Sequence, residues 1–79
     1  MTSHLKLISV NANVLAVQTV NGAHVGNLKR IGEIWKFKAV GYRANGEMEP
    51  GGGPLTGQHN TVFVSPDADA VSARLAPHL

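Results

Sequence analysis

Basic side chains are the residues of this chain whose types and spacing offer the clearest chemistry. Lys36 and Lys38 alternate with the aromatic residues Trp35 and Phe37, and other cations stand before and after them. Basic side chains neutralise phosphates, and a two-stranded ribbon that carries them fits the major groove of DNA. We therefore predict a nucleic-acid-binding sheet face formed by Lys29, Arg30, Lys36, Lys38 and Arg43. The alternative is an ordinary solvated sheet face, where lysine is the usual exposed residue.

Catalytic chemistry is the next class that the residues allow us to test. A hydrolase needs a nucleophile, a base and an acid within reach of one another. His59, Ser65 and Asp67 supply the right types, but Ser65 precedes Pro66 in a pattern typical of a helix start, where it serves as a cap. The strained glycine turn that exposes a nucleophilic serine is missing from the sequence. We predict that the protein is not an enzyme and has no catalytic residues.

Metal and phosphate sites have equally little support. The four histidines lie far apart in the sequence and form no pair at ligand spacing, and the chain has no cysteine. The alternative is a metal site that His59 forms with Glu47 or Glu49 across the loop. The run Gly51-Gly52-Gly53 is followed by proline rather than by Gly-Lys-Ser/Thr, so it is not a phosphate loop. We predict no metal and no cofactor, and a flexible loop over residues 50–57.

Length and composition limit the class of protein. Seventy-nine residues make one domain, residues 1–79, and 43% hydrophobic residues exclude a disordered chain. No apolar stretch approaches the roughly 20 residues of a membrane span, so we predict a cytoplasmic protein without a membrane partner. A domain this small buries only about 60% of its extended surface, and this chain has no disulfide to stabilise it. Self-association as a structural or protein-interaction homodimer is therefore the alternative function.

Charge is distributed unevenly along the chain. Residues 24–43 hold the five cations named above against Glu33 alone, whereas residues 47–69 hold four carboxylates and no lysine or arginine. Such asymmetry can mark a nucleic-acid surface. It can equally mark two surfaces that pair with each other, within one chain or across a dimer.

The elements that must position these residues follow from alternation and turns. Residues 5–10, 14–20 and 23–30 are rich in strand formers, and Asn21-Gly22 predicts a type I′ hairpin between the last two. Residues 34–42 alternate, with Trp35, Phe37 and Ala39 expected in the core and the lysines exposed. Asn45-Gly46 predicts a second hairpin, with a short strand at residues 47–49, and residues 61–64 predict a last strand.

A C-terminal helix completes the predicted fold. Ser65 suits the N-cap, Pro66 the first helical position and Asp67 the positive end of the helix dipole, and Pro77 ends the helix. Its inward stripe is Ala68, Val71, Ser72 and Leu75. We therefore predict an α+β domain in which an antiparallel sheet of four to five strands packs against one C-terminal helix. In it, Phe37 and Trp35 lie beneath the helix stripe.

Two segments also carry a family resemblance. The run Trp35-Lys36-Phe37-Lys38-Ala39, followed later by Phe63-Val64-Ser65-Pro66-Asp67-Ala68-Asp69-Ala70, resembles the sheet-then-helix part of AP2-type and integrase-arm DNA-binding domains. That resemblance implies DNA contacts for the five basic residues named above. It covers about half of the chain, and residues 50–57 depart from the short connection of those families. Residues 25–32 with residues 50–56 also resemble small bacterial proteins without an assigned function, which implies no mechanism.

Overall fold

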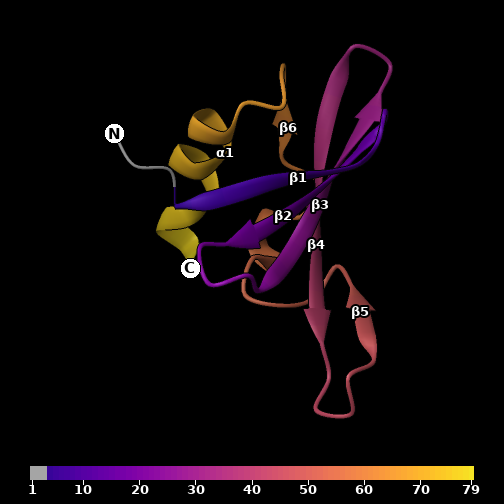
Figure 1. Cartoon of the computed structure of the whole chain (residues 1–79), viewed down its shortest axis with the longest axis vertical. Coiled ribbons are helices and arrows are strands. Elements are labelled where there is room, and N and C mark those ends of the chain that lie inside the picture. The colour runs from indigo at the N-terminus through magenta and orange to yellow at the C-terminus, as the bar shows by residue number, and fades with distance from the viewer. Residues whose placement is uncertain (1–3) are drawn as a thin grey trace.

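The sheet is an antiparallel meander that is extended at both ends of its fourth strand. The computed structural model describes residues 4–79. Strands follow the order β1-β2-β3-β4, and β4 pairs in addition with β5 and with β6 (Figure 1). The predicted α+β fold is confirmed. The sheet has six strands, of which β5 has three residues and β6 has two. In chain order the elements are β1 Leu5–Asn11, β2 Val14–Thr19, β3 His24–Ile31, β4 Ile34–Tyr42, β5 Met48–Pro50, η1 Thr56–Gln58, β6 Val62–Phe63, α1 Ala68–Leu75 and η2 Ala76–His78.

The two Asn-Gly hairpins are confirmed, but the Asn21-Gly22 turn is not of the predicted type I′. Gly22 and Gly46 have φ angles of 88° and 85°, whereas neither asparagine before them has a positive φ. The Gly22 N–H donates to the Thr19 carbonyl at 2.9 Å, and the Gly46 N–H donates to the Arg43 carbonyl at 2.8 Å. Each hairpin is therefore a type I turn closed by a left-handed glycine, so only the glycine needs the unusual backbone conformation.

A register slip between β2 and β3 decides which side chains reach the core. Val17 lies opposite Gly26, but the next residue, Gln18, lies opposite His24. Val25 is left as the extra residue of a β-bulge, and its side chain is buried with the core. The slip turns His24 to the opposite face from Val25.

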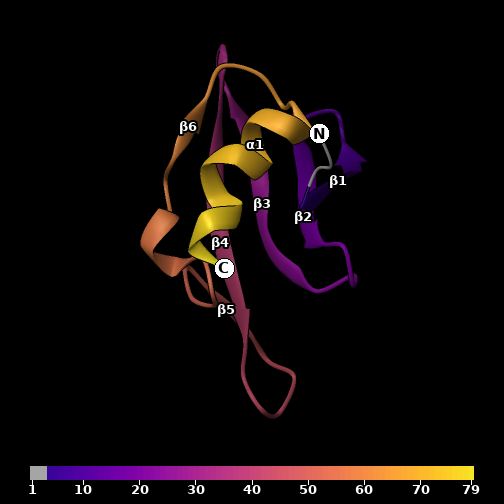
Figure 2. The same ribbon diagram turned by 90° about the vertical axis from the view of Figure 1, so that its left-hand side faces the viewer.

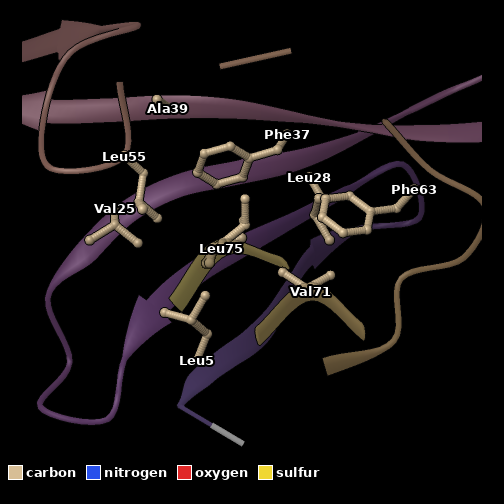
Figure 3. Packing of buried hydrophobic residues seen from close by; sticks show 10 residues of the cluster. Leu5, Val25, Leu28, Phe37, Ala39, Leu55, Phe63, Val71 and Leu75 are labelled. Atoms are coloured by element: carbon tan, nitrogen blue, oxygen red, sulfur yellow. The ribbon is translucent and has the colours of Figure 1, made fainter. Parts of the chain in front are cut away.

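The core lies between one face of the sheet and α1. Figure 2 shows the helix packed across the strands, and Figure 3 shows Phe37 above Leu75 and Val71. Phe37, Val71 and Leu75 are each 0% exposed, so the predicted packing of the helix stripe on β4 is confirmed. Trp35 is only half-buried and packs at the margin of the cluster. The full set of buried core residues is Leu5, Val17, Val25, Leu28, Phe37, Ala39, Leu55, Phe63, Val71 and Leu75.

The helix begins later than the sequence predicted. Asp67 is the N-cap: its carboxylate accepts the N–H of Ala70 at 3.0 Å, and its carbonyl accepts the N–H of Val71 at 2.9 Å. Ser65 lies two residues before this cap and outside the helix, and the carboxylate of Asp67 also favours the positive end of the helix dipole. The buried Ser72 hydroxyl accepts the N–H of Leu5 at 3.0 Å, which ties the helix to β1.

The glycine-rich segment lies directly on β4. The Gly51 N–H donates to the Ala39 carbonyl at 2.7 Å, and Leu55 is 0% exposed. Gly53 has a φ of 83°, and a Cβ added there would lie 2.3 Å from the Val40 carbonyl oxygen. Gly53 is therefore required by close backbone contact. Flexibility of residues 50–57 stays a prediction.

We expect Gly53→Ala to lower the free energy of unfolding by at least about 2 kcal/mol. A left-handed conformation costs a residue with a Cβ about 1–2 kcal/mol, and the contact with the Val40 carbonyl adds to this. Gly57→Ala is the matched control, because a Cβ there meets nothing within 4 Å; its effect stays within about 1 kcal/mol. Urea unfolding measures both. Equal effects of the two substitutions would contradict the close packing of the loop on β4.

Candidate nucleic-acid interface

The face of the sheet opposite α1 carries the lysines of the two central strands. Alternation along β4 turns Lys36 and Lys38 away from the helix, because Phe37 between them is in the core. The register places Lys29 opposite Lys36 and Asn27 opposite Lys38, so these β3 side chains share the same face. In both ribbon views α1 lies on one side of the sheet (Figure 1 and Figure 2). We call the face away from α1 the open face.

Lys29 and Lys36 form a cross-strand pair of like charge. Directly opposite side chains in an antiparallel pair stand about 5 Å apart at Cβ, and like charges there are destabilising. Strands β1 to β4 contain no aspartate or glutamate that could neutralise them. Lys29 is exposed and Lys36 is half-buried, so the charge faces solvent while part of the Lys36 stem is covered. The two central strands of the open face therefore carry positive charge that no carboxylate on β1 to β4 compensates.

Lys38 is held at the edge of β4 by the segment that follows η1. Its Nζ donates to Asn60 Oδ1 at 2.5 Å, and the Asn60 N–H donates to the Phe37 carbonyl at 2.7 Å. The neighbouring His59 accepts the N–H of Ala39 on Nδ1 at 3.0 Å. The lysine predicted to be exposed is therefore half-buried, because this segment lies beside it.

A chain of hydrogen bonds continues the open face from Asn27 to Tyr42. His24 Nε2 lies 3.0 Å from Asn27 Oδ1, and His24 Nδ1 lies 2.7 Å from the Tyr42 hydroxyl. In a neutral ring, Nε2 donates to the amide oxygen and Nδ1 accepts from the hydroxyl. The two rings are 6.0 Å apart at an angle of 52°. The β-bulge produces this arrangement by turning His24 to the open face.

Of the five predicted contact residues, the structure brings three together and places two elsewhere. Lys29, Lys36 and Lys38 share the open face. Arg30 lies opposite Trp35 on the helix side, with its Nε 3.2 Å from the Gly32 carbonyl. Arg43 lies beyond β4 in the β4–β5 hairpin, where it forms an exposed ion pair with Glu49 at 3.3 Å.

Sequence reasoning also missed other polar residues of the open face, among them Lys6, His24 and Asn27. Lys6 lies opposite Gln18, which in turn lies opposite His24. Alternation between Leu5 and Leu7 is a signal that could have placed Lys6. His24 had no such signal, because only the register slip beside Val25 turns it to this face.

The described residues give little support for a metal site or a membrane span. Residues 4–79 contain no group of three metal-ligating side chains placed to hold an ion. His59, the alternative metal ligand, uses Nδ1 for the backbone of Ala39. No helix among these residues is long and apolar enough to cross a membrane.

Comparison with known proteins adds no family. The chain matches no family model, no curated protein and no solved structure. The resemblance to AP2-type and integrase-arm domains and to small bacterial proteins therefore stays a prediction.

We expect Lys36→Glu to raise the free energy of unfolding by about 0.2–1 kcal/mol at low salt. The substitution replaces repulsion opposite Lys29 with attraction, and both residue types are poor strand formers. Lys6→Glu is the control, because Lys6 lies opposite the uncharged Gln18. Urea unfolding at about 0.01 M and 1 M salt should show the gain shrink as the Debye length falls from about 30 Å to 3 Å. A gain independent of salt would contradict the repulsion.

Proposed function

We propose that this protein is a small non-catalytic binding module that contacts nucleic acid with its open face. The observation that carries the proposal is the direct pairing of Lys29 with Lys36 in a sheet whose four long strands lack carboxylates. A protein gains no stability from such a pair, whereas a bound phosphate relieves its repulsion and releases counterions from the nucleic acid. Lys38 lies two residues along β4 and adds a third cation.

The remaining parts of the proposal rest on charge and composition. Arg30 and Arg43 lie outside the lysine cluster, so we assign them only a share in the long-range attraction. We propose the cytoplasm as the location, in keeping with a chain that has no cysteine.

Titration of labelled oligonucleotides tests the proposal. Single-stranded and duplex DNA and RNA are titrated with protein at about 50 mM salt and followed by fluorescence anisotropy. We expect binding at tens of micromolar or tighter, with the logarithm of affinity falling by about two to three per tenfold increase in salt, since three lysines neutralise phosphates.

Two matched variants locate the interface. Lys36→Ala and Arg43→Ala each remove one positive charge, but only Lys36 lies on the open face. We expect Lys36→Ala to weaken binding several-fold and Arg43→Ala to leave it within about twofold. The proposal is wrong if none of the four oligonucleotide types binds.

A second candidate function is a protein-interaction domain that forms a homodimer, and the edge of β1 that is unpaired among the described residues supports it. Within residues 4–79, β1 pairs on one side only, with β2, so it is an edge of the sheet. An edge strand presents free N–H and C=O groups to other chains. Ile8 and Val10 on this strand are 42% and 61% exposed, and pairing with a second β1 would cover them.

We expect sedimentation over a range of concentrations to show a monomer–dimer equilibrium if β1 pairs with itself. Ile8→Lys should shift the equilibrium toward monomer, because it adds a charge to the edge. Val64→Lys is the control, since Val64 is 87% exposed and lies outside β1. A monomer at every concentration up to about 1 mM would count against the homodimer.

A further inference from the structure

The position of the lysines within the sheet limits the form of nucleic acid that can reach them. Lys29 and Lys36 lie on β3 and β4, the central strands, with β1 and β2 on one side and β6 on the other. Neighbouring strands are about 4.8 Å apart, so five strands span roughly 20 Å. The major groove of duplex DNA is about 12 Å wide and admits an α-helix or a two-stranded ribbon, but not a sheet of this width. These lysines therefore cannot enter a groove, and the sequence-based expectation of groove binding does not fit the sheet.

One aromatic ring and two positive charges lie along the same strand of the open face. Lys36, Lys38 and Tyr42 point the same way from β4, and the six steps along the strand from Lys36 to Tyr42 extend about 20 Å. Tyr42 is 54% exposed, and hydrogen bonds join its hydroxyl through His24 to Asn27, which lies opposite Lys38. Cations therefore occupy one end of this strip and an exposed aromatic ring occupies the other. The buried Val40 lies between them on β4, and the polar link runs beside it through His24 and Asn27 on β3.

We infer that the open face binds a single strand of nucleic acid, laid along β4 with phosphates at the lysines and a base stacked on Tyr42. This inference rests on the proposed function and specifies its partner. A single strand presents phosphates and unstacked bases together, whereas a duplex presents its phosphates but keeps its bases paired. The same ligand then offers phosphates to the lysines at one end of the strip and a base to Tyr42 at the other.

The hydrogen bond of Tyr42 prepares its ring for stacking. The His24–Tyr42 bond of 2.7 Å fixes the hydroxyl, and the bond from His24 to Asn27 fixes the histidine in turn. A side chain already held in place loses less conformational freedom when a ligand binds it. Stacking on an aromatic ring tolerates any base, so we expect little sequence preference.

Binding of a ten-nucleotide oligothymidine and of a ten-base-pair duplex tests the inference. We expect the single strand to bind more tightly than the duplex at equal salt. Tyr42→Ala should weaken oligothymidine binding about tenfold and leave the salt slope unchanged, since the ring carries no charge. Tyr42→Phe is the matched control and should stay within about threefold, because the ring remains. Lys36→Ala should instead reduce the salt slope by about 0.7.

A second measurement avoids any loss of folding in the variants. Tyr42 is the single tyrosine of the chain, so its ring protons can be followed by NMR in the unaltered protein during oligothymidine addition. We expect their resonances to shift upfield as a base stacks on the ring. Equal or tighter binding of the duplex, or an unshifted Tyr42 ring in the saturated complex, would overturn the single-strand inference and leave the proposed function standing. Failure of every nucleic acid to bind would remove both.

Discussion

Strand β4 is hydrogen-bonded along both edges, and the rest of the structure depends on this. On one edge it pairs with β3 from Gly26 to Ile31. On the other edge its backbone is paired successively by β6, Thr61, Asn60, the His59 ring, Gly51 and β5. A strand bound on both sides cannot slip, because a shift by one residue would exchange its core and solvent faces. The fixed register keeps Phe37 beneath α1 and therefore keeps Lys36 and Lys38 on the open face.

The same strand links the stability of the domain to the charge of its surface. A domain of this size is stable by about 4–12 kcal/mol, and a like-charge pair such as Lys29 and Lys36 costs up to about 1 kcal/mol of that. Burial of Phe37, at 0% exposure, is worth several times more than this cost. The core can therefore support an unfavourable surface arrangement.

Patterns within single segments predicted most of the fold. Alternation identified the core face of β4, the Asn-Gly pairs identified two hairpins, and apolar spacing identified Val71, Ser72 and Leu75 as the buried side of α1. The cap was misplaced because Ser65 and Asp67 both have suitable side chains, and the choice depends on the path of the chain after β6. These elements were predictable because each depends on residues close together in the sequence.

The site was predicted less completely because it depends on register. Adjacent strand residues point to opposite faces, so alternation alone separates Lys29 from Arg30. Which of them joins Lys36 is decided by the Gly32 turn, which sets Lys29 opposite Lys36 and Arg30 opposite Trp35. The roles of His24 and His59 required tertiary contacts: the first faces Tyr42 because of a β-bulge, and the second bonds to Ala39 across 20 positions of sequence.

The two proposed functions use different parts of the sheet and are compatible. Pairing through β1 would occupy the outer edge of the sheet, whereas the lysine cluster lies on the central strands. If a twofold axis in the plane of the sheet related two domains joined edge to edge, their open faces would lie on opposite sides. If the axis were perpendicular to the sheet, the two open faces would lie side by side. Antiparallel pairing of two β1 strands into one continuous sheet can use the perpendicular axis, because it keeps equivalent faces on the same side. A homodimer of that kind would present two lysine clusters on one surface, so dimerisation would extend a nucleic-acid surface rather than replace it.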